Sequence, residues 1–260
     1  MCLMLFAFRI HHDYRFIFAG NRDEFYDRPT LQAAFREEDP GMLAGKDLQG
    51  GGTWFGVTRE GRFAGLTNYR DPKSLKKDAP SRGMLVSRFL TGSQSPSAYI
   101  DSMKKDAHIY NGFNLILGNR DELSWYSNRG DDERRLGPGM YGLSNHLLDT
   151  PWPKVKRGKA EFTRLISETD MPGPGAFFSL LEDRTQADDN ELPDTGVGLE
   201  RERMLSAVFV SSPDYGTCSS TLLLIGSDDH VTFMERTFNK GSAHTSPSRY
   251  DFKIEPERSG

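Results

Sequence analysis

The cysteine at position 2 directly follows the initiator methionine, and this position can make it a nucleophile. An initiator methionine is usually removed when the next side chain is small, as cysteine is. Removal would leave a thiol and a free α-amine on one carbon, whereas a retained Met1 would block that amine. An α-amine titrates near ~7.7–8.0, so a useful fraction is an unprotonated base at neutral pH. Such a residue can serve as nucleophile and proton acceptor together. The alternative is a packed cysteine in a first strand, which is common for a free cysteine.

A charged tetrad is predicted to lie beside this thiol. Residues 2–10 and 14–19 are apolar runs typical of two strands joined by a turn, and Asn21–Arg22–Asp23–Glu24 follows the second run. If the turn is centred on residue 12, the hairpin register places Arg22 opposite Cys2. A cation favours the thiolate, and a carboxylate can orient an α-ammonium group. The alternative is a solvated turn with local ion pairs.

The rest of the chain is predicted to form strands and helices in blocks. Strands are expected at 53–58, 62–67, 112–117, 122–127, 205–210, 219–225, 231–238 and 250–254. Helices are expected at 81–90, 97–105, 154–166 and 175–182, and a surface loop at the acidic segment 183–200. Blocks of this kind, rather than alternating βαβ units, indicate an α+β fold with mainly antiparallel sheets. Nothing in the sequence is typical of a linker, so residues 1–260 are predicted to form a single domain.

The composition excludes several classes of protein. Hydrophobic residues make up 36% and charged residues 27%, which suits a chain with a sizeable core. The 33 basic and 37 acidic residues leave a formal charge of −4, so no basic excess favours nucleic acid as a partner. The apolar runs are far shorter than the ~18 residues that span a bilayer, so no transmembrane segment is expected. Two distant cysteines give neither a disulfide framework nor a zinc site, and we expect a soluble cytoplasmic protein with a small-molecule ligand or substrate.

Short motifs run in order along nearly the whole chain. They include Met1–Cys2, Ala19–Gly20–Asn21–Arg22–Asp23–Glu24, Gly51–Gly52–Thr53–Trp54–Phe55–Gly56–Val57, Leu66–Thr67–Asn68–Tyr69–Arg70–Asp71–Pro72, Ser81–Arg82–Gly83, Gly142–Leu143–Ser144–Asn145 and Thr150–Pro151–Trp152–Pro153–Lys154–Val155. In these motifs the sequence resembles the NRDE-motif family, also called the Transport and Golgi Organisation 2 family. That family is similar to the N-terminal-nucleophile hydrolases. The resemblance therefore implies a four-layer αββα sandwich of two mainly antiparallel sheets.

The resemblance also implies roles for the charged residues. By analogy with the bile-salt and penicillin V acylases, which use an N-terminal cysteine, Cys2 matches the nucleophile and Arg22 the arginine near the thiol. Asp23 or Glu24 matches the carboxylate on the α-amine, and the choice between them stays open. In the acylases the arginine and aspartate are three residues apart, whereas Arg22 and Asp23 are adjacent here.

Amide side chains complete the implied site. Asn68 and Asn145 match the positions of groups that hold a tetrahedral oxyanion. Contacts with the substrate are expected from Asn21, Glu24, Trp54, Tyr69, Arg70 and His146. Trp54 also has the alternative of packing in the core. The family usually has an arginine where this chain has Cys218, and we expect that thiol to be a packed strand residue rather than a second nucleophile.

Two functions are therefore open. The first is a cysteine amidohydrolase or acyltransferase that acts on a small amide and requires no cofactor. The second comes from the family's association with haem trafficking and with acyl-CoA or lipid handling: a carrier of an amphipathic anion, with haem as the possible ligand. In that case Cys2 or His146 would contact the haem iron, and Arg22 and Arg70 would bind propionate or phosphate groups. The six histidines show no metal spacing, and His11 and His12 are expected in an exposed turn.

Overall fold

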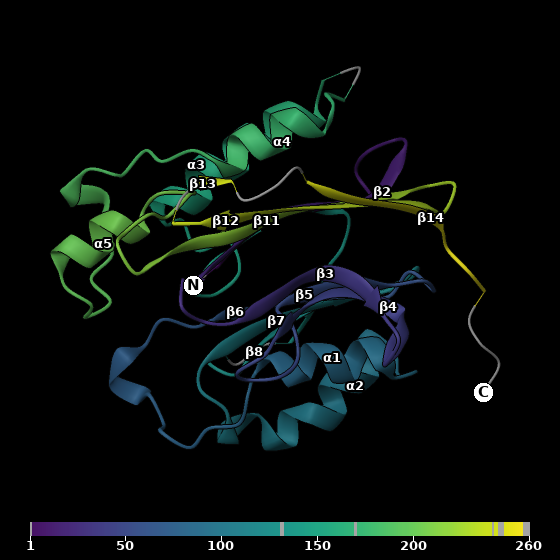
Figure 1. Cartoon of the computed structure of the whole chain (residues 1–260), viewed down its shortest axis with the longest axis horizontal. Helices are drawn as coiled ribbons and strands as arrows, with labels where there is room; N and C mark the ends of the chain where they lie inside the picture. Colours follow the sequence, from purple (N-terminus) through teal and green to yellow (C-terminus); the bar gives the residue numbers. More distant parts are fainter. Residues whose placement is uncertain (1, 131–132, 169–170, 241, 244–246, 257–260) are drawn as a thin grey trace.

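Two antiparallel sheets lie face to face, and helices cover the outer face of each (Figure 1). The computed structural model describes residues 2–130, 133–168, 171–240, 242–243 and 247–256. The order of layers is helices, sheet, sheet, helices, which confirms the predicted α+β fold and the four-layer sandwich.

The first sheet joins strands from both ends of the chain. It contains β1 (Cys2–Phe8), β2 (Tyr14–Phe25), β10 (Gly139–Leu143), β11 (Tyr215–Gly226), β12 (His230–Asn239), β13 (Ser242–Ala243) and β14 (Ser248–Lys253). The strand order is β10-β1-β2-β11-β12, and β13 and β14 both pair with β12. The strands that carry Cys2 and the charged tetrad are therefore central in this sheet.

The second sheet is a meander from one continuous stretch of sequence. It runs in chain order through β3 (Thr30–Arg36), β4 (Asp39–Asp47), β5 (Phe55–Thr58), β6 (Phe63–Asn68), β7 (Phe113–Gly118), β8 (Leu123–Ser127) and β9 (Arg134–Arg135). This stretch is inserted between β2 and β10 of the first sheet.

The helices pack on the outer faces with their apolar sides. Helices α1 (Gly83–Thr91) and α2 (Pro96–Met103) contact the second sheet, and α3 (Pro153–Ile166) and α4 (Pro174–Leu181) contact the first. A further helix, α5 (Leu199–Leu205), and three 3₁₀ turns, η1 (Pro72–Ser74), η2 (Lys104–Ile109) and η3 (Asp189–Glu191), complete the regular structure. None of the helices in the described part of the chain is long and apolar enough to cross a membrane.

The side-chain alternation of β1 divides its residues between two cores. Cys2, Met4 and Phe6 belong to the core between the two sheets, whereas Leu3 and Leu5 belong to the core beneath α3 and α4. Successive residues of a strand point to opposite faces, and here both faces are covered, so all of β1 is buried. The same alternation continues through β2 and decides which way the charged residues point.

Several predicted elements differ from the structure. The strand predicted at 205–210 is wrong, because Leu205 is the last residue of α5 and the buried backbone after it, at 206–210, forms no strand. Instead, Phe209 N–H donates to the backbone carbonyl oxygen of Asp183, and Val210 N–H donates to Thr217 Oγ1. Strands β3 and β4 were not predicted, since their sequences are polar and only partly buried. Strand β2 also runs to Phe25 rather than ending at Ala19, because its polar end pairs with β11.

Candidate active site

The register of the first hairpin places the charged tetrad beside the thiol. Cys2 pairs with Arg22 across β1 and β2, which confirms the predicted register. Five of the predicted site residues line a cavity of about 1100 Å³, namely Cys2, Arg22, Glu24, Trp54 and Asn68, and Asp23 also contributes to its wall. The structure therefore gathers residues from β2, β6 and the segment before β5 around the amino end of β1.

Cys2 lines this cavity and is only 7% exposed. Burial raises the pKa of the Cys2 thiol above its ordinary value, and the Asp23 carboxylate adds to the rise. Arg22 and the Asp23 backbone N–H act in the opposite direction. The thiol is consequently protonated at neutral pH, and a base must take its proton when the sulfur reacts.

Asp23 points away from the space between the sheets and toward α3. Its Oδ1 accepts a hydrogen bond from Thr217 Oγ1 (2.8 Å), and its Oδ2 lies 3.7 Å from Nζ of Lys154, which is fully buried. Burial raises the pKa of Asp23 and lowers the pKa of Lys154, while their mutual attraction opposes both shifts. The two residues form a buried ion pair immediately behind the Cys2–Arg22 pair.

Lys154 was not among the predicted site residues. It lies at the start of α3 on the same face as the buried Gly158 and Phe162. A lysine at helical spacing with buried residues is the signal that could have found it, since lysine is almost never fully buried without a partner.

Glu24 lies among arginines on the cavity side. Its Oε2 is 4.0 Å from Arg22 Nη2 and 3.8 Å from Arg28 Nε, and Arg28 also pairs with Asp47 at 2.7 Å. The two neighbouring carboxylates of the tetrad are thus held by different cations: Asp23 by a lysine in the helix layer, and Glu24 by arginines at the cavity.

The two predicted oxyanion asparagines are neighbours. Asn68 lines the cavity, and its backbone carbonyl accepts a hydrogen bond from Asn145 Nδ2 (2.8 Å). Asn145 is fully buried and does not line the cavity. Next to it, Ser144 Oγ donates to the Cys2 carbonyl oxygen (2.9 Å). The Ser144–Asn145 segment therefore ties the ends of β1 and β6 together.

Four residues predicted to contact the substrate do not line the cavity: Asn21, Tyr69, Arg70 and His146. Asn21 donates from Nδ2 to the carbonyls of Leu181 (2.8 Å) and Val208 (2.9 Å), so its amide fastens the helix layer to β2. Arg70 pairs with buried Glu202 at 2.6 Å and lies over the Trp152 ring. His146 Nδ1 lies 2.9 Å from Thr150 Oγ1, and its ring packs against Tyr69.

Cys218 is the second thiol on the cavity wall. It occupies a bulge of β11 between Thr217, which pairs with Asp23, and Ser219, which pairs with Arg22. Burial raises the pKa of Cys218 to about 11, although Arg22 opposes the rise. This thiol is therefore a weak nucleophile at neutral pH.

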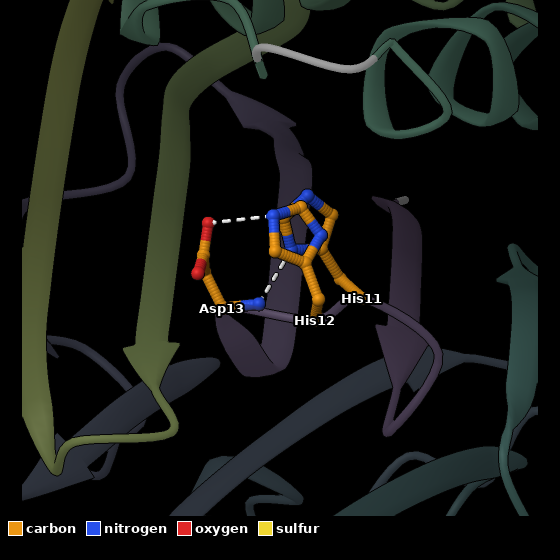
Figure 2. Close-up of side chains that lie close together, drawn as sticks. All are labelled: His11, His12 and Asp13. Atoms are coloured by element: carbon orange, nitrogen blue, oxygen red, sulfur yellow. Dashed lines mark hydrogen bonds and ion pairs between the residues drawn. The ribbon is translucent and has the colours of Figure 1, made fainter.

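A cluster of His11, His12 and Asp13 lies far from this cavity, in the turn between β1 and β2 (Figure 2). The two rings are stacked with centroids 4.5 Å apart, and His12 Nε2 lies 3.0 Å from Asp13 Oδ2. Asp13 N–H donates to His11 Nδ1 at 3.1 Å. Since this His11 lone pair and the Asp13 carboxylate are already engaged, the cluster is a set of local contacts rather than an open set of ligands.

Comparisons with known proteins agree with the sequence motifs. The sequence model of the family "Transport and Golgi organisation 2" matches residues 1–240. The chain is 40% identical to a Transport and Golgi organization protein 2 homolog of Bos taurus, over 91% of this chain and 93% of that protein. It is 37% identical to the Homo sapiens homolog, over 98% of this chain and 100% of that protein.

Among solved structures, an N-acylethanolamine-hydrolyzing acid amidase ortholog of Caenorhabditis elegans matches with 10% identity and a TM-score of 0.47, covering 86% of this chain and 92% of that one. A C2A mutant of the conjugated bile acid hydrolase from Clostridium perfringens matches with 9% identity and a TM-score of 0.46, covering 98% and 92%. On the sequence matches, the chain belongs to the Transport and Golgi organisation 2 family.

Proposed function

We propose that this protein is a cysteine amidohydrolase or acyltransferase that cleaves a small amide with Cys2 as its nucleophile. The observation that carries the proposal is the position of the Cys2 thiol in the wall of a large cavity, opposite Arg22 and in front of the buried Asp23–Lys154 pair. Polar groups of this kind around a cysteine are typical of a reactive thiol rather than of a structural one.

The chemistry begins when Met1 is removed and the α-amine of Cys2 becomes free. The sulfur forms a bond to the amide carbonyl carbon, and the α-amine takes the thiol proton. The C–N bond of the amide then breaks as the same proton passes to the leaving amine. Water, or a second amine in a transfer reaction, attacks the resulting thioester, and its proton returns to the sulfur.

The surrounding residues take separate parts in this reaction. Arg22 stabilises negative charge on the sulfur, and the Asp23 carboxylate orients the α-ammonium form of the amine. Asn68, which lines the cavity, donates to the oxyanion, and such a donor is worth about 10²–10³ in rate. Asn145 positions Asn68 through the hydrogen bond to its carbonyl.

The test is an acyl adduct on Cys2. Protein with Met1 removed, verified by intact mass, is incubated with a panel of N-acyl amides and then examined by intact mass and peptide mapping. We expect an acyl group on Cys2, and none in Cys2→Ala. The matched control is Cys218→Ala, which removes the other cavity thiol and should leave the adduct unchanged. An adduct that persists in Cys2→Ala, or no adduct with any amide, would rule out the proposal.

The carrier function is the second candidate, because the size of the cavity and its arginines also suit a large amphipathic anion such as haem. A haem titration of the wild-type protein, Cys2→Ala and His146→Ala distinguishes the two. Saturable haem binding with a Soret shift that is lost in Cys2→Ala, together with no amide turnover, would favour the carrier. His146 is held by Thr150 outside the cavity wall, so we expect His146→Ala to bind haem as the wild type does.

A further inference from the structure

One arginine of the cavity differs from the others in its partners. Arg82 lies at the start of α1, is about half-buried and lines the same cavity as Cys2. Its Nη1 donates to the Gly112 carbonyl oxygen at 2.9 Å. Within the described chain, no carboxylate forms an ion pair with its guanidinium, whereas Arg28 is bound to Asp47 and Arg22 lies beside Glu24.

The surroundings of Arg82 favour an incoming anion. Burial lowers the pKa of Arg82, and the nearby Arg28 adds to this effect. Glu24 and the Cys2 thiol oppose it, so they are close enough to interact with its charge. The N-terminal end of α1 adds a positive partial charge on the same side of the cavity. A partly buried guanidinium whose hydrogen-bond partner is a single carbonyl oxygen is stabilised when it binds a carboxylate or a phosphate.

We propose that Arg82 binds an anionic group of the substrate, so that the amide cleaved at Cys2 belongs to a molecule carrying a carboxylate or a phosphate. Gly112 holds the guanidinium through Nη1, and two of the remaining N–H groups of this cavity-lining arginine can hold the oxygens of one anion. Arg28 is less suited to this task because Asp47 and Glu24 already occupy its fork. This inference rests on the proposed function of the same cavity and names its class of substrate.

The test uses two alkylating agents of nearly the same shape, anionic iodoacetate and neutral iodoacetamide. The rates at which each modifies Cys2 are measured in a Cys218→Ala background and divided by the corresponding rates for glutathione. We expect the iodoacetate-to-iodoacetamide ratio to fall about tenfold in Arg82→Gln, which corresponds to the loss of one charge-assisted hydrogen bond. Arg88→Gln removes an exposed arginine from the same helix outside the cavity and should leave the ratio unchanged.

Two further measurements test the role of Arg82 even if the Arg82→Gln variant folds poorly. Arg82→Lys retains the charge and should retain most of the ratio, and rising sodium chloride should lower the wild-type ratio by screening. Inorganic phosphate and glutarate are then added as competitors, and the more effective one identifies the kind of anion. A ratio that is the same in the wild type, in Arg82→Gln and at high salt would overturn the inference.

The alkylation ratio is measured without any amide substrate, so it tests the anion site separately from the proposed amide cleavage. If no acyl adduct forms but the alkylation ratio depends on Arg82, the anion site is supported and the proposed amide chemistry is ruled out. If the acyl adduct forms but the alkylation ratio is the same with and without Arg82, the amide chemistry is supported and the anion site is ruled out.

Discussion

At the scale of single residues, the two thiols of the cavity differ in their chemical surroundings. Cys2 faces Arg22 and, once Met1 is removed, carries its own amine base, whereas Cys218 lies in a strand bulge near the carbonyl oxygens of Glu24 and Gly216. Carbonyl oxygens do not stabilise a thiolate. Under the proposed function, Cys2 is therefore the nucleophile and Cys218 is not.

The high pKa of Cys218, about 11, can be read from its reactivity. In the Cys2→Ala variant, we expect the rate of alkylation by iodoacetamide to rise about tenfold per pH unit between about pH 8 and pH 10, since only the thiolate reacts. The rate is followed by intact mass, with circular dichroism at each pH to verify the fold. A rate that levels off near the ordinary thiol pKa of about 8.5 would contradict this prediction.

The Asp23–Lys154 pair gives a prediction for stability. Replacing one partner of a buried ion pair leaves an uncompensated charge, so Lys154→Met should lower the free energy of unfolding by about 3–5 kcal/mol at neutral pH. The double variant Asp23→Asn/Lys154→Met removes both charges and should recover much of this loss. Urea unfolding of the single and double variants measures both effects, and a double variant less stable than Lys154→Met would contradict the argument.

The same variant has a defined dependence on pH. Burial already raises the pKa of Asp23 in the folded protein, and removing the lysine raises it further. The folded state then binds a proton more tightly than the unfolded state, so stability falls as pH rises from about 4 through the folded pKa. The deficit of Lys154→Met should accordingly be small near pH 4 and should grow as the pH rises toward the folded-state pKa of Asp23.

At the scale of elements, the start of α1 packs closely against the segment that leads into β5. This contact positions the part of the cavity wall that contains Arg82. Gly52 has a φ of +74°, and a Cβ there would overlap the backbone of Gly83 at the first turn of α1. Thr53 N–H donates to the Gly83 carbonyl at 3.3 Å. The glycine run at 50–52 thus permits a close contact between a loop and a helix end.

We expect Gly52→Ala to lower the free energy of unfolding by about 1–3 kcal/mol, because it forces a left-handed residue to carry a side chain where no space exists. Gly137→Ala is the matched control, since a Cβ at Gly137 would meet no atom within 4 Å. Urea unfolding of both variants checks the prediction. Equal stabilities would show that α1 moves away without cost.

Glu235, which lines the cavity, connects the two sheets. The irregular register of β3 between Leu31 and Ala34 leaves Ala33 N–H free of its own sheet, and Glu235 Oε1 of β12 accepts it at 2.7 Å. Tyr250 of β14 donates to the carbonyl of Ala33 at 3.0 Å. A bulge in an edge region of the second sheet is therefore fastened by side chains of the first.

At the scale of the whole molecule, the first sheet needs both ends of the chain. Strand β2 lies between β1 and β11, so the insertion that forms the second sheet divides the first sheet in sequence but not in space. The core between the sheets contains Trp125 from the second sheet, Trp54 from the segment just before β5, and Phe6 and Phe18 from the first sheet. Loss of either sheet exposes this shared core.

We therefore expect the predicted single domain to unfold in one transition. Tryptophan fluorescence reports mainly on the core between the sheets, and far-ultraviolet circular dichroism reports on strands and helices in all layers. Their urea midpoints should coincide. Two separate midpoints would show that one sheet with its helices is stable alone.

Local pattern was sufficient for much of the fold. The apolar runs of the first hairpin predicted the pairing of Cys2 with Arg22, because a short turn and a two-residue period fix the register. The buried stripe of α3 was visible in the spacing of Val155, Phe162 and Leu165. The family motifs gave the layers, which the structure confirms.

The distribution of charge in the site was decided only by tertiary structure. The sequence contains the Asn-Arg-Asp-Glu run, but distant segments supply the partners of two of its members: Leu181 and Val208 for Asn21, and Lys154 for Asp23. Glu24, by contrast, has a local partner, Arg28. Likewise, the distant Glu202 holds Arg70 outside the cavity wall, whereas His146 is held there by the nearby Thr150. A side chain's neighbours along the chain follow from periodicity, whereas the ion pairs and hydrogen bonds that fix its role form between elements brought together only by packing.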